Sequence, residues 1–304
     1  GINFASRDPK ILVDLHKMTE GHLDASIMVA YLEQKERDEA SLENATAMAN
    51  QILTQIEEMV AKNCTAVDIA YTPDNLWQLK KDGKRAIMLG IENGYAIGKD
   101  ICNVEAFRKR GVVYMTLCHN GDNDICDSAR GNHEHGGVSE FGKQVIEEMN
   151  RVGMMVDLSH AGEESFYDAL QISKTPIVCS HSSARALCDH PRNLTDEQMR
   201  ALAKTGGVAQ VTLYHGFLKK QTDATILDAI DHLNHMVNIM GIEHVGIGTD
   251  FDGDGGIRGC ASASELINFT RRLLRERYTE EQIQMIWGGN FLRVMRQVQA
   301  HSKK

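Results

Sequence analysis

Six short apolar runs in the sequence each end on residues that could bind a metal ion or move a proton. The residues that follow the runs are, in order, Glu92, His119, His160, His181, the pair Tyr214–His215, and Asp250. Imidazole and carboxylate groups are typical ligands of zinc and of related metals, and one carboxylate can bridge two ions. Two neighbouring ions can hold a hydroxide at neutral pH, and an unligated carboxylate nearby can transfer protons. A single histidine in such a place would indicate only a structural hydrogen bond, but the series predicts a metal site with hydrolytic chemistry.

The elements that must position these residues are short β-rich runs that alternate with amphipathic helices. Runs that are apolar on both faces and separated by helices are typical of a parallel sheet covered by helices. The carboxyl ends of parallel barrel strands lie at one rim, where active sites are built. The strands are expected at Ser26–Leu32, Ala86–Ile91, Val112–Cys118, Met154–Ser159, Ile177–Ser180, Val208–Leu213 and His244–Thr249. The helices are expected at Ser41–Lys62, Ser139–Val152, Glu163–Ile172, Thr195–Lys204 and Thr222–Met240.

This alternation predicts an α/β fold, a (β/α)8 TIM-type barrel of the metal-dependent hydrolase type. The 304 residues contain four prolines and no linker-like segment, so residues 1–304 are interpreted as a single catalytic domain. Seven strands are expected where a closed barrel needs eight. Ala66–Tyr71 is interpreted as a short accessory piece, because the next segment follows it closely. We therefore expect the first barrel strand at the extreme N-terminus or upstream of Gly1.

Composition excludes several classes of partner. Lys and Arg number 33 against 42 Asp and Glu, which gives a net charge of -9, and no basic cluster is present. Nucleic acids and anionic membranes are therefore not expected partners.

Seven scattered cysteines without a CxxC pair favour reduced thiols over a disulfide framework. No transmembrane segment and no signal peptide are visible, but the chain opens at Gly1, so a cytoplasmic or exported location is left open.

Five segments resemble, in order, the motifs of the membrane dipeptidase family, the renal dipeptidase-like metallopeptidases. They read GIENGYAIG, MTLCHNGDND, VDLSHAGEESFYDAL, PIVCSHSSARALCDHPRN and HVGIGTDFDGDGG, and the likeness extends from about Ile11 to Gln299. The resemblance implies a (β/α)8 barrel with two zinc ions (Zn2+) per chain, which cleaves dipeptides by means of a metal-bridging hydroxide.

The resemblance also implies roles for individual residues. Glu92 resembles the carboxylate that bridges the two metals, and His160 and His181 resemble the imidazole ligands of the second metal.

On the substrate side, His119 resembles the histidine that holds the substrate carbonyl and its oxyanion. Arg192 resembles the residue that binds the terminal carboxylate of the substrate. Asp250 is similar to the acid/base that passes a proton to the departing amine. The residues alone support Arg192 less, because a single loop arginine is usually solvated, although a guanidinium could clamp a carboxylate with two parallel hydrogen bonds.

The sequence departs from the family pattern at the first metal site, where the family has a His-x-Asp pair at the end of its first strand. His22-Leu23-Asp24 has these residue types but precedes the strand expected at Ser26–Leu32. It should therefore lie at the rim opposite Glu92, and we do not assign it as a ligand. Both the missing His-x-Asp pair and the missing eighth strand would be explained if the first segment of the barrel lay upstream of Gly1. His133-Glu134-His135, in a loop rich in Gly and Asn, is expected to be solvated.

Three functions follow from these observations. The favoured one is a zinc-dependent dipeptidase, a binuclear metallo-hydrolase that acts on small dipeptides. The first alternative is another barrel amidohydrolase acting on a cyclic amide or a phosphoester, for which Arg192 would have no carboxylate to bind. The second is a non-catalytic metal- or peptide-binding barrel that has lost its first metal site. The preferred dipeptide and the formation of a homodimer are left open.

Overall fold

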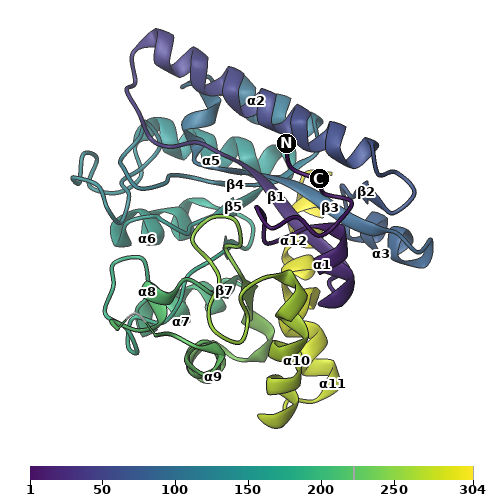
Figure 1. Cartoon of the computed structure of the whole chain (residues 1–304). Coiled ribbons are helices and arrows are strands. Elements are labelled where there is room, and N and C mark those ends of the chain that lie inside the picture. The colour runs from purple at the N-terminus through teal and green to yellow at the C-terminus, as the bar shows by residue number, and fades with distance from the viewer. Residues whose placement is uncertain (222, 304) are drawn as a thin grey trace. The chain divides into compact units, whose positions relative to one another are not determined.

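The computed structural model describes residues 1–221 and 223–303 and contains eight parallel strands that alternate with helices (Figure 1). The strand order is β1-β3-β4-β5-β6-β7-β8, and β2 pairs with β3 outside this path. The predicted α/β class is confirmed, and all seven expected strands are present. The strands are β1 Ala25–Tyr31, β2 Val67–Ile69, β3 Arg85–Glu92, β4 Val112–Thr116, β5 Met155–Asp157, β6 Val178–Cys179, β7 Val208–Thr212 and β8 Val245–Gly248.

The five expected helices are also present, although residue 222, where the last was expected to begin, lies outside the described residues. Thr195 caps the helix that begins at Asp196, because Thr195 and Gln198 exchange hydrogen bonds between side chain and backbone. The expected helices are α2 Glu39–Ala61, α5 Glu140–Val152, α6 Glu163–Ile172, α7 Asp196–Lys204 and α9 Ile226–Met240. The others are α1 Leu15–Glu20, α3 Pro73–Lys81, α4 Cys102–Lys109, α8 His215–Leu218, α10 Leu266–Arg275, α11 Glu280–Gln284 and α12 Asn290–His301.

The chain divides into two compact units, and one of them carries strands β1 to β6. This unit comprises Ala25–Cys179, Thr205–Gly207 and Arg293–Lys304. Its strands are buried on both faces along most of β3 and all of β4, as expected for a parallel sheet covered by helices. In the register of β1 and β3, Ala25 pairs with Ala86 and Tyr31 pairs with Glu92. Tyr31 and Glu92 therefore lie side by side at the carboxyl ends of their strands.

Strand β2 is the short accessory piece that the sequence predicts. Its three residues pair only with the beginning of β3, at residues 85–87, whereas β4 pairs with the end of β3, at residues 89–92. Helix α3 begins four residues after β2 ends, with Thr72 as its N-cap and Pro73 in its first turn. Residues 1–24 contain no strand, so β1 is the first strand of the described chain.

The other unit carries β7 and β8 and comprises Gly1–Asp24, Ser180–Lys204 and Val208–Leu292. The segment that contains His181 lies beside β7, because Ser182 N–H donates to the Gln210 carbonyl at 2.8 Å. It also lies against β8, since a Cβ atom at Gly248 would sit 1.8 Å from the Ser180 carbonyl oxygen. Only glycine allows this approach, and it brings His181 close to the strand that leads to Asp250.

No helix in the described ranges is both long enough and apolar enough to cross a membrane.

Candidate functional site

Glu92 and His160 meet at the carboxyl ends of β3 and β5. The Nε2 atom of His160 lies 3.2 Å from Oε2 of Glu92, and both side chains are largely buried. His160 has a φ of +73°, which a non-glycine residue rarely adopts. The strained turn is held by its own carbonyl, which accepts a hydrogen bond from Ala129 N–H at 2.8 Å and lies 3.3 Å from the Ser128 hydroxyl. The backbone is thus fixed in the conformation that directs this imidazole toward Glu92.

The other nitrogen of the His160 ring is held by Asn120, whose Oδ1 lies 3.1 Å from Nδ1. A neutral imidazole that donates from Nδ1 carries a lone pair on Nε2, and here Nε2 lies opposite a carboxylate oxygen. In that form, a cation between the two atoms would join them. Two ligand atoms about 2.0–2.1 Å from a tetrahedral zinc ion would be about 3.3 Å apart, which matches the observed distance. The residues therefore fit a metal ion, and Asn120 supplies the outer hydrogen bond typical of metal-binding histidines.

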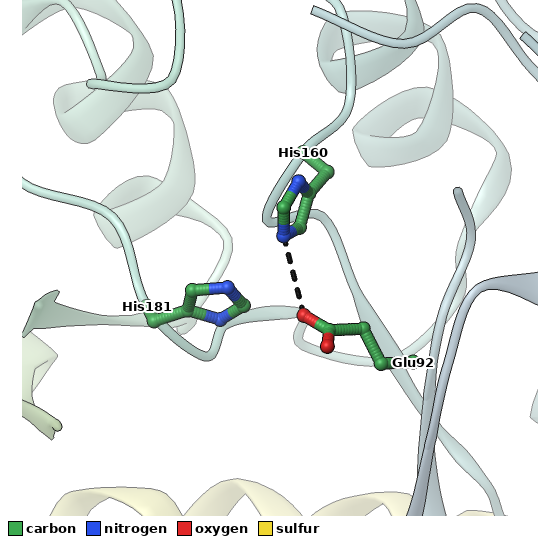
Figure 2. A group of neighbouring side chains, drawn as sticks. All are labelled: Glu92, His160 and His181. Carbon is green, nitrogen blue, oxygen red and sulfur yellow. Dashed lines mark hydrogen bonds and ion pairs between the residues drawn. The ribbon is translucent and has the colours of Figure 1, made fainter. Parts of the chain in front are cut away.

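His181 completes a group of three donors with Glu92 and His160 (Figure 2). One ligand atom from each residue lies within 4.8 Å of the other two, and the two imidazoles approach the carboxylate of Glu92 from different sides. The Nδ1 atom of His181 lies 2.8 Å from the Ser180 hydroxyl, so this ring is also oriented by an outer polar group. The three residues were expected at one metal site, and the structure brings them together.

His119 lies beside His160 rather than among the three donors. The two imidazole centroids are 4.3 Å apart, and the ring of Tyr31 contacts His119 edge-on at 4.7 Å. The Ser128 hydroxyl donates to the His119 carbonyl, which ties the loop after β4 to the turn of His160. His119 is only partly buried, so it borders the metal group in a position to meet a bound molecule.

Tyr31 and Asn120 are site residues that no local pattern in the sequence indicates. Tyr31 was placed inside the expected strand, and its position opposite Glu92 depends on the register of β1 with β3. Tyr31 remains 42% exposed, so it too can contact a ligand. Asn120 directly follows His119, but its contact with His160, forty residues later, is visible only in three dimensions.

Arg192 is buried, unlike the solvated loop arginine that would be the ordinary expectation. Its residue is 3% exposed, its Nη2 donates to the His181 carbonyl at 2.9 Å, and its guanidinium lies 5.1 Å from the centroid of the Phe217 ring. A guanidinium held over an aromatic ring is positioned for a planar, bidentate partner such as a carboxylate. The hydrogen bond to the His181 carbonyl also links this cation directly to the segment that carries His181.

Asp250 lies in a tight loop two residues after β8. Its φ is +57°, and its carbonyl accepts hydrogen bonds from Gly253 N–H at 3.1 Å and Gly255 N–H at 2.8 Å. A Cβ atom at Gly255 would lie 2.0 Å from the Thr249 carbonyl oxygen, so the loop can close only with glycine there. The carboxylate is therefore carried by a closely packed, half-buried turn.

The residues that we excluded as ligands lie elsewhere or have other contacts. Asp24 precedes Ala25, which pairs with Ala86, six residues before Glu92. Six residues of strand span about 20 Å, so the His22–Asp24 segment is at the end of β1 remote from Glu92. In the 133–135 cluster, Glu134 pairs with Arg37 at 2.7 Å, and His135 Nε2 lies 2.6 Å from the Asn123 carbonyl.

Comparison with known proteins gives a family match over the whole chain. Residues 1–304 match the family model described as membrane dipeptidase, peptidase family M19. An uncharacterised dipeptidase of Schizosaccharomyces pombe is 35% identical over 94% of this chain and 72% of its own length. The dipeptidase tcpJ of Claviceps purpurea is 31% identical over 94% of this chain and 69% of its own length.

Solved structures agree with this match. A protein of Pseudomonas aeruginosa described as a probable dipeptidase, PvdM, has a TM-score of 0.92 and 26% identity, with 97% of this chain and 91% of that chain covered. An amidohydrolase of the same organism has a TM-score of 0.84 and 29% identity, with 97% and 94% covered. The predicted fold class is thereby confirmed as the α/β, TIM-like barrel fold of these two proteins.

Proposed function

The chain belongs to the membrane dipeptidase family, peptidase family M19, and from this premise we propose that it is a zinc-dependent dipeptidase. The observation that carries the proposal is the group formed by Glu92, His160 and His181, in which each imidazole has an outer polar partner. Two imidazoles and a carboxylate are a typical zinc donor set. When bound, the metal would activate water and polarise the peptide carbonyl. The family implies two zinc ions per chain, and Glu92, His160 and His181 would be among the residues that hold them.

Three surrounding side chains bind the substrate carbonyl, bind the substrate carboxylate and transfer the proton. His119, beside His160, donates to the carbonyl oxygen of the substrate as negative charge develops there. Arg192 binds the terminal carboxylate through its guanidinium, which the His181 carbonyl and Phe217 hold in place. Asp250 takes a proton from water and delivers it to the leaving amine. We further propose that residues 1–304 act as one catalytic domain.

Metal analysis and a substrate screen test the proposal together. We expect purified protein to contain bound zinc, and to hydrolyse dipeptides with a free C-terminal carboxylate much faster than the corresponding C-terminal amides. Glu92→Gln should lose metal and activity together. Zinc binding without hydrolysis of any dipeptide would contradict the enzymatic proposal and favour the non-catalytic alternative.

Arg192 separates the dipeptidase from an amidohydrolase acting on cyclic amides or phosphoesters. Arg192→Met should raise KM for dipeptides at least about tenfold, because a charged hydrogen bond contributes about 1.5–3 kcal/mol. Hydrolysis of a dipeptide amide should change little in the same variant, since that substrate has no terminal carboxylate. Equal losses on both substrates would refute this assignment of Arg192.

A further inference from the structure

The loop that carries Asp250 contains a second strained acidic residue, Asp252. Asp250 and Asp252 have φ angles of +57° and +67°, in the left-handed region that residues with a side chain seldom occupy. Such conformations cost about 1–3 kcal/mol each and persist where neighbouring structure enforces them. The hydrogen bonds of Gly253 and Gly255 to Asp250 lie within the loop. A contact from outside the loop would further restrain the strained conformation.

That external restraint comes from the N-terminal segment. The backbone N–H of Leu12 donates to Oδ1 of Asp252 at 2.7 Å, although the two residues are 240 positions apart. The carbonyl of the same Leu12 accepts a hydrogen bond from Ala263 N–H at 3.0 Å. The Leu12 peptide thus bridges the Asp250 loop and the segment that leads into α10.

A buried ion pair between Lys17 and Asp14 ties the N-terminal segment together at this point. The ammonium group of Lys17 donates to the Asp14 carboxylate at 2.7 Å, to the Asp8 carbonyl at 2.6 Å and to the Ile11 carbonyl. Lys17 and Asp14 are both buried, and all three ammonium donors are satisfied. Asp14 also accepts from Asp8 N–H at 3.0 Å. This Lys17–Asp14 clasp fixes the backbone immediately before Leu12.

We propose that Asp252 is a positioning residue for Asp250, acting through Leu12 and the Lys17–Asp14 clasp. The carboxylate of Asp252 touches no reacting atom in this proposal. It anchors a strained turn to the N-terminal segment, and so sets the direction in which the Asp250 carboxylate points. The inference rests on the proposed function, because it assumes that Asp250 moves the proton.

Three variants test the proposal, with turnover of one dipeptide as the first measurement. Asp252→Ala removes the acceptor for Leu12 N–H, and we expect kcat to fall about ten- to a hundredfold with KM nearly unchanged. Asp252→Asn keeps an oxygen acceptor and should restore most of kcat. Asp254→Ala is the matched control, because it removes an exposed carboxylate from the same loop. Bound zinc is measured in every variant and should not change.

Amide hydrogen exchange separates this proposal from the proposed function. In Asp252→Ala, the amides of Leu12 and Gly255 should exchange faster than in the unmodified chain, and in Asp252→Asn they should remain protected. If the unmodified chain hydrolyses no dipeptide, the proposed function fails, and the exchange data still decide whether Asp252 holds the loop. Unchanged exchange in Asp252→Ala, or equal kcat losses in Asp252→Ala and Asp254→Ala, would overturn the inference.

Discussion

At the scale of single residues, the imidazole of His160 shows how many contacts outside the three proposed ligands shape the proposed metal site. Nδ1 is engaged by Asn120 at 3.1 Å, the backbone is held in a left-handed turn, and Nε2 faces Glu92 at 3.2 Å. Each restraint limits the motion of the His160 ring, so less conformational entropy is lost when a metal ion binds. Preorganisation of this kind increases affinity without any change in the ligands themselves.

Asn120→Ala should therefore weaken zinc binding while leaving all three ligands in place. Loss of an outer hydrogen bond to a ligand typically costs about 10- to 100-fold in metal affinity. Competition with a chromophoric chelator measures this directly, and activity should return at high zinc concentration. Asn132→Ala, an exposed substitution in the same loop, is the control. Unchanged zinc affinity in Asn120→Ala would show that this contact does not orient the ligand.

Asp250→Asn should abolish turnover and leave the bound metal intact. The amide cannot accept or deliver a proton at neutral pH, and proton transfer by a positioned side chain contributes about 10²–10⁴-fold to a rate. The substitution keeps the size of the side chain, so the glycine-dependent turn around it should survive. Steady-state kinetics together with zinc content check the prediction, and retained turnover would remove Asp250 from the chemistry.

At the scale of elements, helix α9 supports the loop that carries Arg192. His232 on α9 is buried, and its Nδ1 accepts a hydrogen bond from Ala184 N–H at 3.0 Å. Its Nε2 contacts the Leu218 carbonyl at 2.9 Å, at the end of α8. The same imidazole thus joins the segment after His181 to the helix that supplies Phe217. The ring can make both contacts only as the neutral tautomer with a proton on Nε2.

This arrangement makes stability depend on pH. Burial lowers the pKa of His232, and the Nε2 contact to Leu218 offsets only part of that effect. The unfolded chain therefore binds a proton more readily than the folded chain. The stabilisation from neutral His232 is complete above the unfolded pKa of about 6.5 and is lost as the pH falls through the lower folded pKa.

His232→Asn should remove this contribution to the pH dependence. We expect urea unfolding to show a variant that is less stable than the unmodified chain at pH 7.5, with a smaller difference at pH 5.5. At pH 7.5 the free energy of unfolding should be about 1–3 kcal/mol lower in the variant, because buried hydrogen bonds of His232 are lost. A difference that stays constant across this range would show that His232 does not titrate with folding.

At the scale of the whole chain, the sequence predicted elements with a strong local pattern, but it did not predict contacts between segments that are distant in the sequence. Buried parallel strands are β-rich apolar runs, so all seven expected strands were found, and the residues directly after them include Glu92 and His160. The short helices α3 and α4 were not predicted, because their few turns carry little periodic signal. Tyr31, Asn120 and the bond from Leu12 to Asp252 depend on pairing between distant segments, which no local pattern encodes.

Metal removal tests whether the three donors act as one site that stabilises the fold. A ligand that binds only the folded state stabilises it by about 2.7 kcal/mol at a free concentration one hundred times Kd. Treatment with a chelator should therefore lower the Tm by several degrees and abolish dipeptide hydrolysis, and added zinc should restore both. Glu92→Gln removes the carboxylate that faces His160, so its Tm should respond much less to the chelator than that of the unmodified chain. If the chelator lowers the Tm of both proteins equally, Glu92 does not belong to the stabilising metal site.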